Sequence, residues 1–283
     1  MTKSAPSICH RLKERETKAG DFLLDFAEKE IQAHKANFHP ENDPKDFIDV
    51  CLREAHLKAS SAVGKENIKK SMVDHLFAGT DTLGSPVLWF ILHMIHYPDI
   101  QRRCQEEIDR WFRDGEMEGD HQLTKDAIVE SLPYTTATLM EILRMVGPAG
   151  ASIPHFARED VTVAGYRVPK GSMVMANIRF MHMDEKNWVR PNDFDPTRWF
   201  DSRVKGASKP ELIHHSAYIP YGVGKRICTG KNIAKVGFLV LSVSLVRNFW
   251  FEAEKGKELP TLVGFGPFAY TPRPFKVVLN PRY

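Results

Sequence analysis

Cys228 lies in a glycine-rich loop, Tyr221-Gly-Val-Gly-Lys-Arg-Ile-Cys-Thr-Gly230, that leads into an apolar helical pattern. A helix N-terminus and the neighbouring basic residues Lys225 and Arg226 lower the pKa of a thiol and favour the thiolate, the form that binds metals. Glycine permits tight turns and the close approach of a large flat ligand, and this loop has three: Gly222, Gly224 and Gly230. From the loop alone, Cys228 is either a ligand or nucleophile, or a small buried core residue.

Two phosphate-binding interpretations of these glycines fail. A P-loop ending here needs glycine at position 219 and serine or threonine at position 226, and the chain has Ile219 and Arg226. A dinucleotide fingerprint that starts at Gly222 needs glycine at position 227, which is Ile227.

A second group, Ala78-Gly-Thr-Asp-Thr82, lies inside the longest helical pattern. The small residues Ala78 and Gly79 would let something bulky pack on the helix. Asp81 and Thr82 are costly in the middle of a buried helix unless they are paired. Two interpretations stay open: Thr82 bonds back to its own helix while Asp81 caps a local kink, or both deliver protons into a dry site.

A third group, Glu141 and Arg144, has the i,i+3 spacing that places two side chains on one helix face. Such pairs are common and usually solvated. Arg198, in the segment Pro191-Asn-Asp-Phe-Asp-Pro-Thr-Arg-Trp199, could complete a buried Glu–Arg–Arg cluster.

Hydrophobic periodicity predicts the elements that carry these groups. Helices are expected over residues 8–36, 46–58, 66–97, 100–113, 125–130, 134–146 and 228–247. The second half of the helix over 66–97 should be buried all round, and Pro86 should kink it or open its hydrogen-bond ladder. One strand from Val161, a turn and a second strand through Met175 follow, and then a long loop over 184–222 and short strands from Phe249 onward.

Composition excludes several classes of protein. The 283 residues include 39 Lys+Arg and 36 Asp+Glu, a balance of +3 that does not indicate nucleic acid as the main partner. The four cysteines form no CxxC pair, so a zinc cluster or a disulfide framework is not expected, and a reducing, cytosol-facing location fits. No signal peptide begins the chain, and the longest uncharged stretch, 82–98, is too short for a membrane anchor.

In this order, these segments resemble the motifs of the cytochrome P450 superfamily. AGTDT matches the oxygen-activating helix motif, Glu141 with Arg144 matches ExxR, Phe194–Trp199 matches the aromatic-region motif, and 221–230 matches the haem loop F-x-x-G-x-R-x-C-x-G, with Tyr221 in place of its phenylalanine. The stretches LPYTTATLMEILRM and AREDVTVAGYRVPKGSMVMANI further resemble the animal microsomal branch. The resemblance extends from about residue 10 to the end of the chain.

The resemblance implies a mainly α fold with small β-sheets, in which the N-terminal portion of the family is missing. That portion carries the membrane anchor, a helix that contacts the haem propionates and a loop that roofs the substrate pocket. The chain is then a single haem-binding domain over 1–283. Its expected parts are a helical part over 10–147 with the oxygen-activation helix over 66–97, strands and a long loop over 148–222, the haem loop with its helix over 221–247, and C-terminal strands over 249–283.

Roles follow from the resemblance residue by residue. Cys228 would be the axial ligand of the haem iron, in a loop whose Gly224 lies against the cofactor. Arg226 would pair with a haem propionate, and His155 either does the same or is a satisfied loop histidine.

The family implies proton delivery by Asp81 and Thr82, with Ala78 and Gly79 leaving room for dioxygen. It also implies a structural role for Glu141, Arg144 and Arg198. Lys225, Lys231 and Lys235 either form a patch that steers an acidic electron donor or are simply a solvated face.

The implied function is a haem-thiolate monooxygenase that inserts one oxygen atom from dioxygen into a lipophilic substrate such as a fatty acid, a steroid or a xenobiotic. Electrons would come from NADPH through a flavoprotein reductase at the cytosolic face of the endoplasmic reticulum membrane. One alternative is a truncated, non-catalytic haem-binding remnant or an incomplete gene model; another is a structural Cys228 without haem. The resemblance places Ala151, Ser152, Ile153 and 264–269 at the substrate pocket without identifying the substrate.

Overall fold

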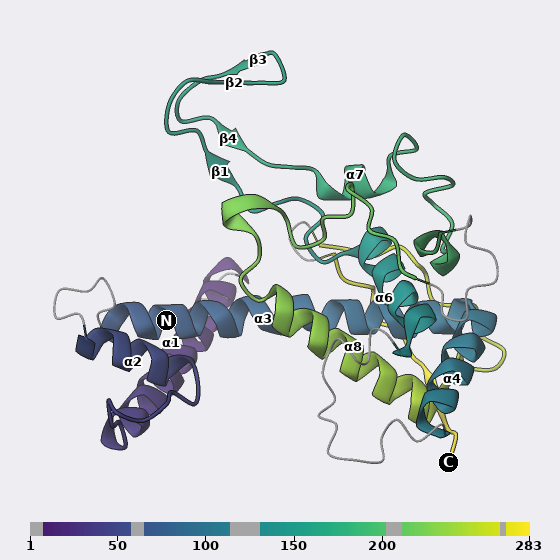
Figure 1. Cartoon of the computed structure of the whole chain (residues 1–283), viewed down its shortest axis with the longest axis horizontal. Coiled ribbons are helices and arrows are strands. Elements are labelled where there is room, and N and C mark those ends of the chain that lie inside the picture. The colour runs from purple at the N-terminus through teal and green to yellow at the C-terminus, as the bar shows by residue number, and fades with distance from the viewer. Residues whose placement is uncertain (1–7, 58–64, 114–130, 202–210, 267–269) are drawn as a thin grey trace, which may run out of the picture. The chain divides into compact units, whose positions relative to one another are not determined.

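The computed structural model describes residues 8–57, 65–113, 131–201, 211–266 and 270–283 (Figure 1). The chain forms two compact units, Met1–Thr80 and Asp81–Tyr283. Helix α3 (Lys65–His96) contributes to both, because its first half belongs to one unit and its second half to the other. The short helix predicted over 125–130 lies outside the described residues.

In the first unit, α1 (Ile8–Ala36) and α2 (Phe47–Leu57) confirm the two predicted N-terminal helices. Helix α2 begins after Asp46 because that carboxylate accepts hydrogen bonds from the backbone N–H groups of Ile48 and Asp49, at 2.9 and 3.0 Å. Among the described residues of this unit, the three helices contribute the buried hydrophobic side chains Ala27, Ile31, Ile48, Leu52 and Ile68.

The second unit contains the main core, built from the second half of α3 and from α4 (Pro98–Arg113), α6 (Pro133–Val146) and α8 (Lys231–Asn248). Trp89, Phe90 and Leu92 in this half of α3 are fully inaccessible to solvent, but Leu88 is 43% exposed, so the predicted burial all round is only partly confirmed. The helix continues through Pro86. Within the described residues, no helix combines the length and the apolar character that a membrane crossing requires.

Helix α4 fixes its neighbours through buried polar side chains. The amide of Gln101 donates to the carbonyl of Phe251 at 3.1 Å and accepts from the N–H of the same residue at 2.8 Å. The carboxylate of Glu107 accepts from the backbone N–H groups of Tyr134 and Thr135, both at 2.7 Å, and so caps the N-terminus of α6. These contacts place α6, which carries Glu141 and Arg144, against the core.

In the described part of the chain, the strands form three two-stranded antiparallel sheets. Strand β1 (His155–Phe156) pairs with β4 (Met173–Val174), β2 (Val161–Val163) pairs with β3 (Tyr166–Val168), and β5 (Phe249–Glu252) pairs with β6 (Val278–Pro281). The prediction of one second strand through Met175 is wrong. Pro169 lacks an N–H, and Gly171 has φ +83°, so the chain turns there and β4 returns to β1.

Short helical turns interrupt the irregular region between the sheets and α8. They are α7 (Ile178–Met183), which the sequence pattern does not predict, η1 (Pro196–Trp199) and η2 (Gly224–Arg226). Helix α8 begins at Lys231 rather than at Cys228, because Gly230 is its N-cap residue. The mainly α fold with small sheets, as expected from the resemblance, is confirmed.

The buried imidazole of His93 predicts an acid-sensitive core. Burial lowers the pKa of His93 to about 4, from 6.5 in an unfolded chain, despite the hydrogen bond to the carbonyl of Trp89. Between these values only the unfolded chain binds the proton, so stability falls as the pH drops from 6.5 towards 4. At pH 5 the loss is on the order of 2 kcal/mol relative to neutral pH. The free energy of unfolding, measured in urea between pH 7 and pH 5, should fall by this amount in wild type and not in His93→Phe. An equal dependence of the free energy of unfolding on pH in the two proteins would contradict the prediction.

Candidate functional site

The Cys228 loop (residues 219–230) is closed by backbone hydrogen bonds. The N–H of Cys228 donates to the carbonyl of Tyr221 at 3.0 Å, and the N–H of Ile227 donates to the carbonyl of Gly224 at 3.1 Å. Gly222 and Gly224 have φ values of +73° and +74°, which other residues rarely adopt. The glycines therefore fold the loop into tight turns, as the sequence predicts.

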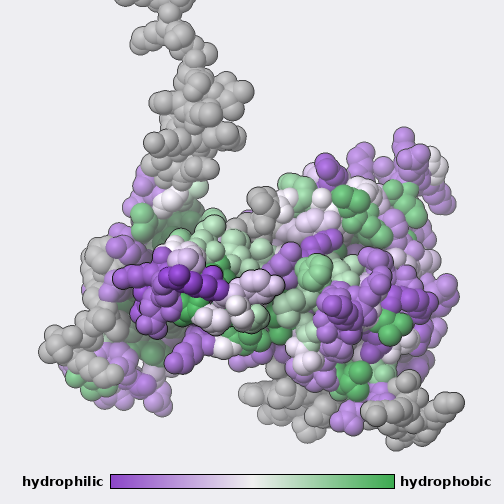
Figure 2. All heavy atoms as spheres, turned by 90° about the horizontal axis from the view of Figure 1, so that it is seen from above, coloured by the Kyte–Doolittle hydropathy of each residue, from purple (hydrophilic) through white to green (hydrophobic). Residues whose placement is uncertain are grey.

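The thiol of Cys228 is accessible and has open space beside it. Cys228 is an exposed free cysteine, so it is not the small buried core residue of the alternative interpretation. Gly230 follows closely, and a Cβ atom added there would lie in van der Waals contact with the sulfur, at 3.9 Å. Val223, Ile227 and Ile233 expose apolar side chains in and after the loop. Figure 2 shows hydrophobic residues at the surface of the molecule beside hydrophilic ones.

Tyr221 anchors the start of the loop in the core of the second unit. Its ring is half-buried and packs against the main hydrophobic cluster. Burial, with a smaller contribution from the nearby Cys228, raises the pKa of Tyr221 to about 12. The hydroxyl therefore stays protonated at neutral pH and remains a hydrogen-bond donor.

The Glu141 cluster (Glu141, Arg144, Arg198 and Trp199) is the most extensively hydrogen-bonded part of this region. The Glu141 carboxylate accepts from Nε and Nη2 of Arg144 at 2.9 and 2.8 Å and from Nε of Arg198 at 2.8 Å. It also accepts from the indole N–H of Trp199 at 3.0 Å and from the backbone N–H of Asp195 at 3.2 Å. Glu141 and Arg144 are 0% and 1% exposed, so this pair is a buried one and not a solvated surface pair.

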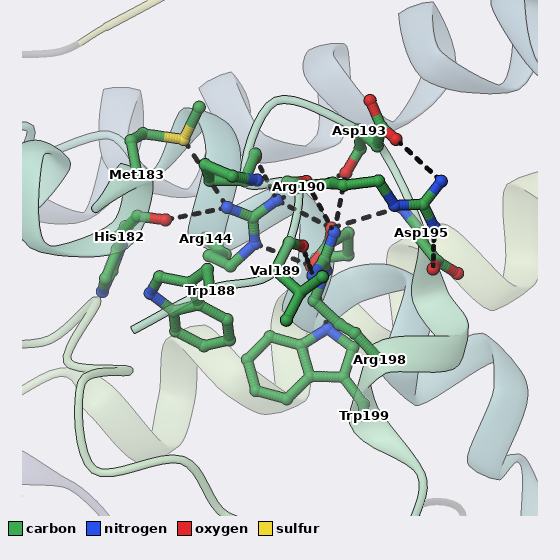
Figure 3. A network of polar contacts seen from close by, with 12 residues as sticks. Arg144, His182, Met183, Trp188, Val189, Arg190, Asp193, Asp195, Arg198 and Trp199 are labelled. Atoms are coloured by element: carbon green, nitrogen blue, oxygen red, sulfur yellow. Dashed lines mark hydrogen bonds and ion pairs between the residues drawn. The ribbon is translucent and has the colours of Figure 1, made fainter. Parts of the chain in front are cut away.

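Arg144 extends the cluster to the irregular chain around it (Figure 3). Its Nη1 donates to the carbonyl of His182 at 2.7 Å, and its Nη2 donates to the carbonyl of Pro191 at 2.8 Å. Arg198 similarly donates to the carbonyl of Val189 at 2.8 Å. The two guanidinium groups thus fix the loop between α7 and η1, which has few backbone hydrogen bonds of its own to define it.

Sequence reasoning missed Trp199 as a member of this cluster, although it closes the motif that contains Arg198. Trp199 is 1% exposed, and a buried indole N–H needs an acceptor. That requirement could have indicated that Trp199 has a buried hydrogen-bond partner. The sequence could not identify this partner as Glu141, which lies 58 residues away.

The predicted oxygen-activation residues are placed differently from the expectation. Asp81 and Thr82 are exposed rather than buried, because the described part of the second unit covers α3 only from about Ser85 onward. Ala78 and Gly79 belong to the first unit, and a Cβ atom added at Gly79 would meet no atom within 4 Å. The hydroxyl of the neighbouring Thr80 donates to the carbonyl of Leu76 in its own helix at 2.7 Å.

Helix α8, which follows Cys228, lies against the part of α3 that follows Thr82. A Cβ atom at Gly237 would lie 3.2 Å from a methyl group of Leu83, so the glycine permits this close packing. The contact fixes the helix after the Cys228 loop to the beginning of the buried half of α3.

A comparison with protein-family models matches residues 4–279 of this chain to the family described as cytochrome P450. The chain belongs to the cytochrome P450 family. Haem is the cofactor of this family.

Similar curated proteins are animal cytochromes P450. The chain is 32% identical to human cytochrome P450 2U1 over 264 residues, which is 92% of this chain and 46% of that protein. It is 30% identical to cytochrome P450 2L1 of Panulirus argus over 92% of this chain and 51% of that one. It is 31% identical to the steroid 17-alpha-hydroxylase/17,20 lyase of Ictalurus punctatus, over 90% of this chain and 49% of that protein. The chain thus spans about half the length of the curated relatives it matches.

A solved zebrafish cytochrome P450 structure with progesterone has the same fold. It superposes with a TM-score of 0.80 at 24% identity, over 98% of this chain and 61% of that chain. At this identity the likeness establishes the fold of this cytochrome P450 chain and not its ligand.

The residues present fit a haem group. An accessible thiol, a glycine backbone that lets a flat ring approach and exposed apolar side chains beside the sulfur are what a thiolate-ligated porphyrin requires. Arg226 in η2 and His155 on β1 are both exposed, and no hydrogen bond or ion pair within the described residues joins them. Lys225 is exposed, whereas Lys231 and Lys235 on α8 are half-buried.

Proposed function

We propose that this cytochrome P450 chain is the haem-thiolate part of a monooxygenase that inserts one oxygen atom from dioxygen into a lipophilic substrate. The observation that carries the proposal is the accessible Cys228 sulfur in a loop closed by the Cys228–Tyr221 and Ile227–Gly224 hydrogen bonds. Haem supplies the oxygen chemistry when it is bound, and a thiolate ligand favours cleavage of the O–O bond.

The chain's own residues would have distinct tasks. Cys228 would hold the iron through its sulfur, and Arg226, exposed in η2, would neutralise a propionate carboxylate. Asp81 and Thr82 would hold and relay protons, because an adjacent carboxyl and hydroxyl can pass a proton by hydrogen bonds. The Glu141 cluster would fix the chain that leads towards the loop without touching the reacting atoms.

The substrate class and the partners belong to the same proposal. Fatty acids, steroids and xenobiotics are lipophilic, and the resemblance to a steroid 17-alpha-hydroxylase/17,20 lyase favours a substrate of this kind. Electrons would come from NADPH through a flavoprotein reductase, with the basic residues Lys225, Lys231 and Lys235 attracting its acidic surface. Similarity to animal microsomal relatives favours the cytosolic face of the endoplasmic reticulum membrane.

A second candidate function is haem binding without turnover, as in the non-catalytic remnant considered above. The exposure of Asp81 and Thr82 favours it, because a proton relay open to solvent loses protons and oxygen intermediates to water. Addition of the reductase, NADPH and a lipophilic substrate to the haem-loaded chain separates the two candidates. Product formation supports the monooxygenase, and haem reduction without product supports the second candidate.

Thr82→Ala should uncouple electron consumption from product formation. Removing a proton-relay hydroxyl slows the proton delivery that leads to product, so we expect about tenfold less product per NADPH consumed. The measurement is the ratio of product to NADPH oxidised, together with the peroxide released. Thr80→Ala is the matched control, because that hydroxyl donates to the carbonyl of Leu76 in its own helix. If the two variants are equally well coupled, Thr82 has no part in the mechanism.

A further inference from the structure

The buried histidine His182 lies between the Glu141 cluster and the Cys228 loop. It belongs to the short helix α7, which begins where the side chain of Asn177 accepts the N–H of Phe180 at 3.0 Å. His182 is 2% exposed. Its backbone carbonyl accepts the 2.7 Å hydrogen bond from Nη1 of Arg144. The main chain at His182 is therefore held by the cluster.

The side chain of His182 points to a different part of the chain. Its Nε2 lies 3.0 Å from the backbone nitrogen of Ile219, and its ring stacks on Tyr218 with the centroids 5.7 Å apart. A backbone N–H can only donate, so Nε2 must carry the lone pair and Nδ1 must carry the proton. Burial lowers the pKa of His182 to about 4, so the ring is neutral at pH 7.

Ile219 is where the Cys228 loop begins. Its carbonyl accepts the N–H of Gly222 at 2.9 Å, and the next turn is closed by the 3.0 Å hydrogen bond from Cys228 to Tyr221. The imidazole of His182 thus accepts the N–H of Ile219 at the start of this segment. At its other end, the N–H of Cys228 closes the second turn. A displacement at Ile219 would be transmitted through these two turns to the backbone of Cys228.

We propose that His182 is a positioning residue for the Cys228 loop: its carbonyl is held by Arg144 and its ring holds Ile219, so it sets the loop relative to the Glu141 cluster. The consequence for haem binding rests on the proposed function, in which Cys228 is the iron ligand. The link between the Glu141 cluster and the Cys228 loop does not depend on that proposed function, and it can be measured on the chain without haem.

The test compares three replacements of His182 in the full chain. In His182→Gln the amide oxygen is the same number of bonds from the backbone as Nε2, so it can still accept from Ile219. In His182→Asn the acceptor is one carbon short, and in His182→Phe the ring can still stack on Tyr218 but has no acceptor. His93→Phe is the matched control, because it removes another buried neutral imidazole, whose Nδ1 is hydrogen-bonded to the carbonyl of Trp89 in its own helix.

Residue-resolved amide hydrogen exchange is the first readout. We expect the amides of Ile219 and Cys228 to exchange about tenfold faster in the Asn and Phe variants, the effect of losing one hydrogen bond, and to stay near wild type in Gln and in His93→Phe. Equal exchange at these amides in all four variants, or equal acceleration in His93→Phe, would overturn the proposal. If the Phe variant does not fold, the comparison of Gln with Asn decides alone.

Haem titration is the second readout, with about tenfold weaker binding expected in the variants that release Ile219. A wild-type chain that takes up no haem would count against the proposed function. The positioning role of His182 would then be decided by hydrogen exchange alone. Released amides combined with unchanged haem affinity would refute positioning of the ligand by His182.

Discussion

Replacing Cys228 by alanine should abolish haem binding with a thiolate ligand. The sulfur is exposed and lies at the end of a loop closed by its own backbone, so its removal leaves no packing defect to obscure the result. The measurement is the absorption spectrum of the reduced, haem-reconstituted chain under carbon monoxide. In wild type the Soret band should be displaced to the long wavelength typical of a thiolate-ligated ferrous complex. In Cys228→Ala this band should be lost.

The matching control is Cys51→Ala, because Cys51 is a half-buried cysteine of the first unit and has no place in the haem motif. It should keep the wild-type band. Stability of the haem-free Cys228→Ala chain should stay within about 0.5 kcal/mol of wild type, as for most exposed positions. Unchanged haem content in Cys228→Ala, or a band typical of histidine ligation in wild type, would remove Cys228 from the iron.

Replacing Glu141 by glutamine should destabilise the second unit by about 3–5 kcal/mol. The change is nearly isosteric, so the cost is electrostatic: the buried guanidinium of Arg144 and the partly buried one of Arg198 lose their counter-charge. The new amide also offers two N–H donors where Arg144, Arg198 and Trp199 already donate. Urea unfolding followed by tryptophan fluorescence measures the change, because Trp188 and Trp199 both lie at the cluster.

Asp99→Asn is the control for this prediction. Asp99 pairs with Arg102 at the same i,i+3 spacing and at 2.8 Å, but the two side chains are 85% and 57% exposed. Solvent screens such a pair, so its loss should cost at most about 0.5 kcal/mol. Similar effects of the two variants would mean that burial of the Glu141 cluster does not govern its contribution.

The two experiments also separate the roles of the two sites. Cys228→Ala should lose haem and keep the stability of the haem-free chain. Glu141→Gln should lose stability first and haem as a consequence, because the loop that presents Cys228 follows chain segments that Arg144 and Arg198 hold. A Glu141→Gln chain that unfolds as wild type but cannot bind haem would place the carboxylate nearer to the cofactor than the structure does.

The sequence by itself predicted the long helices, the order of the motifs and the tight turns of the Cys228 loop. Helices such as α3 and α4 follow from apolar residues at spacings of three and four, which is a local property of the chain. The turns at Gly222 and Gly224 follow from the conformational freedom of glycine, which is also local. Membership of the cytochrome P450 family then followed from residues 4–279 as a whole.

Only the tertiary structure decided which groups are buried and which partners they meet. Asp81 and Thr82 carry the right types for a dry proton relay, yet exposure depends on what packs over a helix, and these two residues are exposed. Residues Met173–Val174 form a separate strand, β4, that pairs with β1 instead of continuing the predicted second strand, because pairing is a contact between distant segments. The same holds for Trp199 on Glu141 and for His182 on Ile219, where a buried donor needs an acceptor and the fold alone selects it.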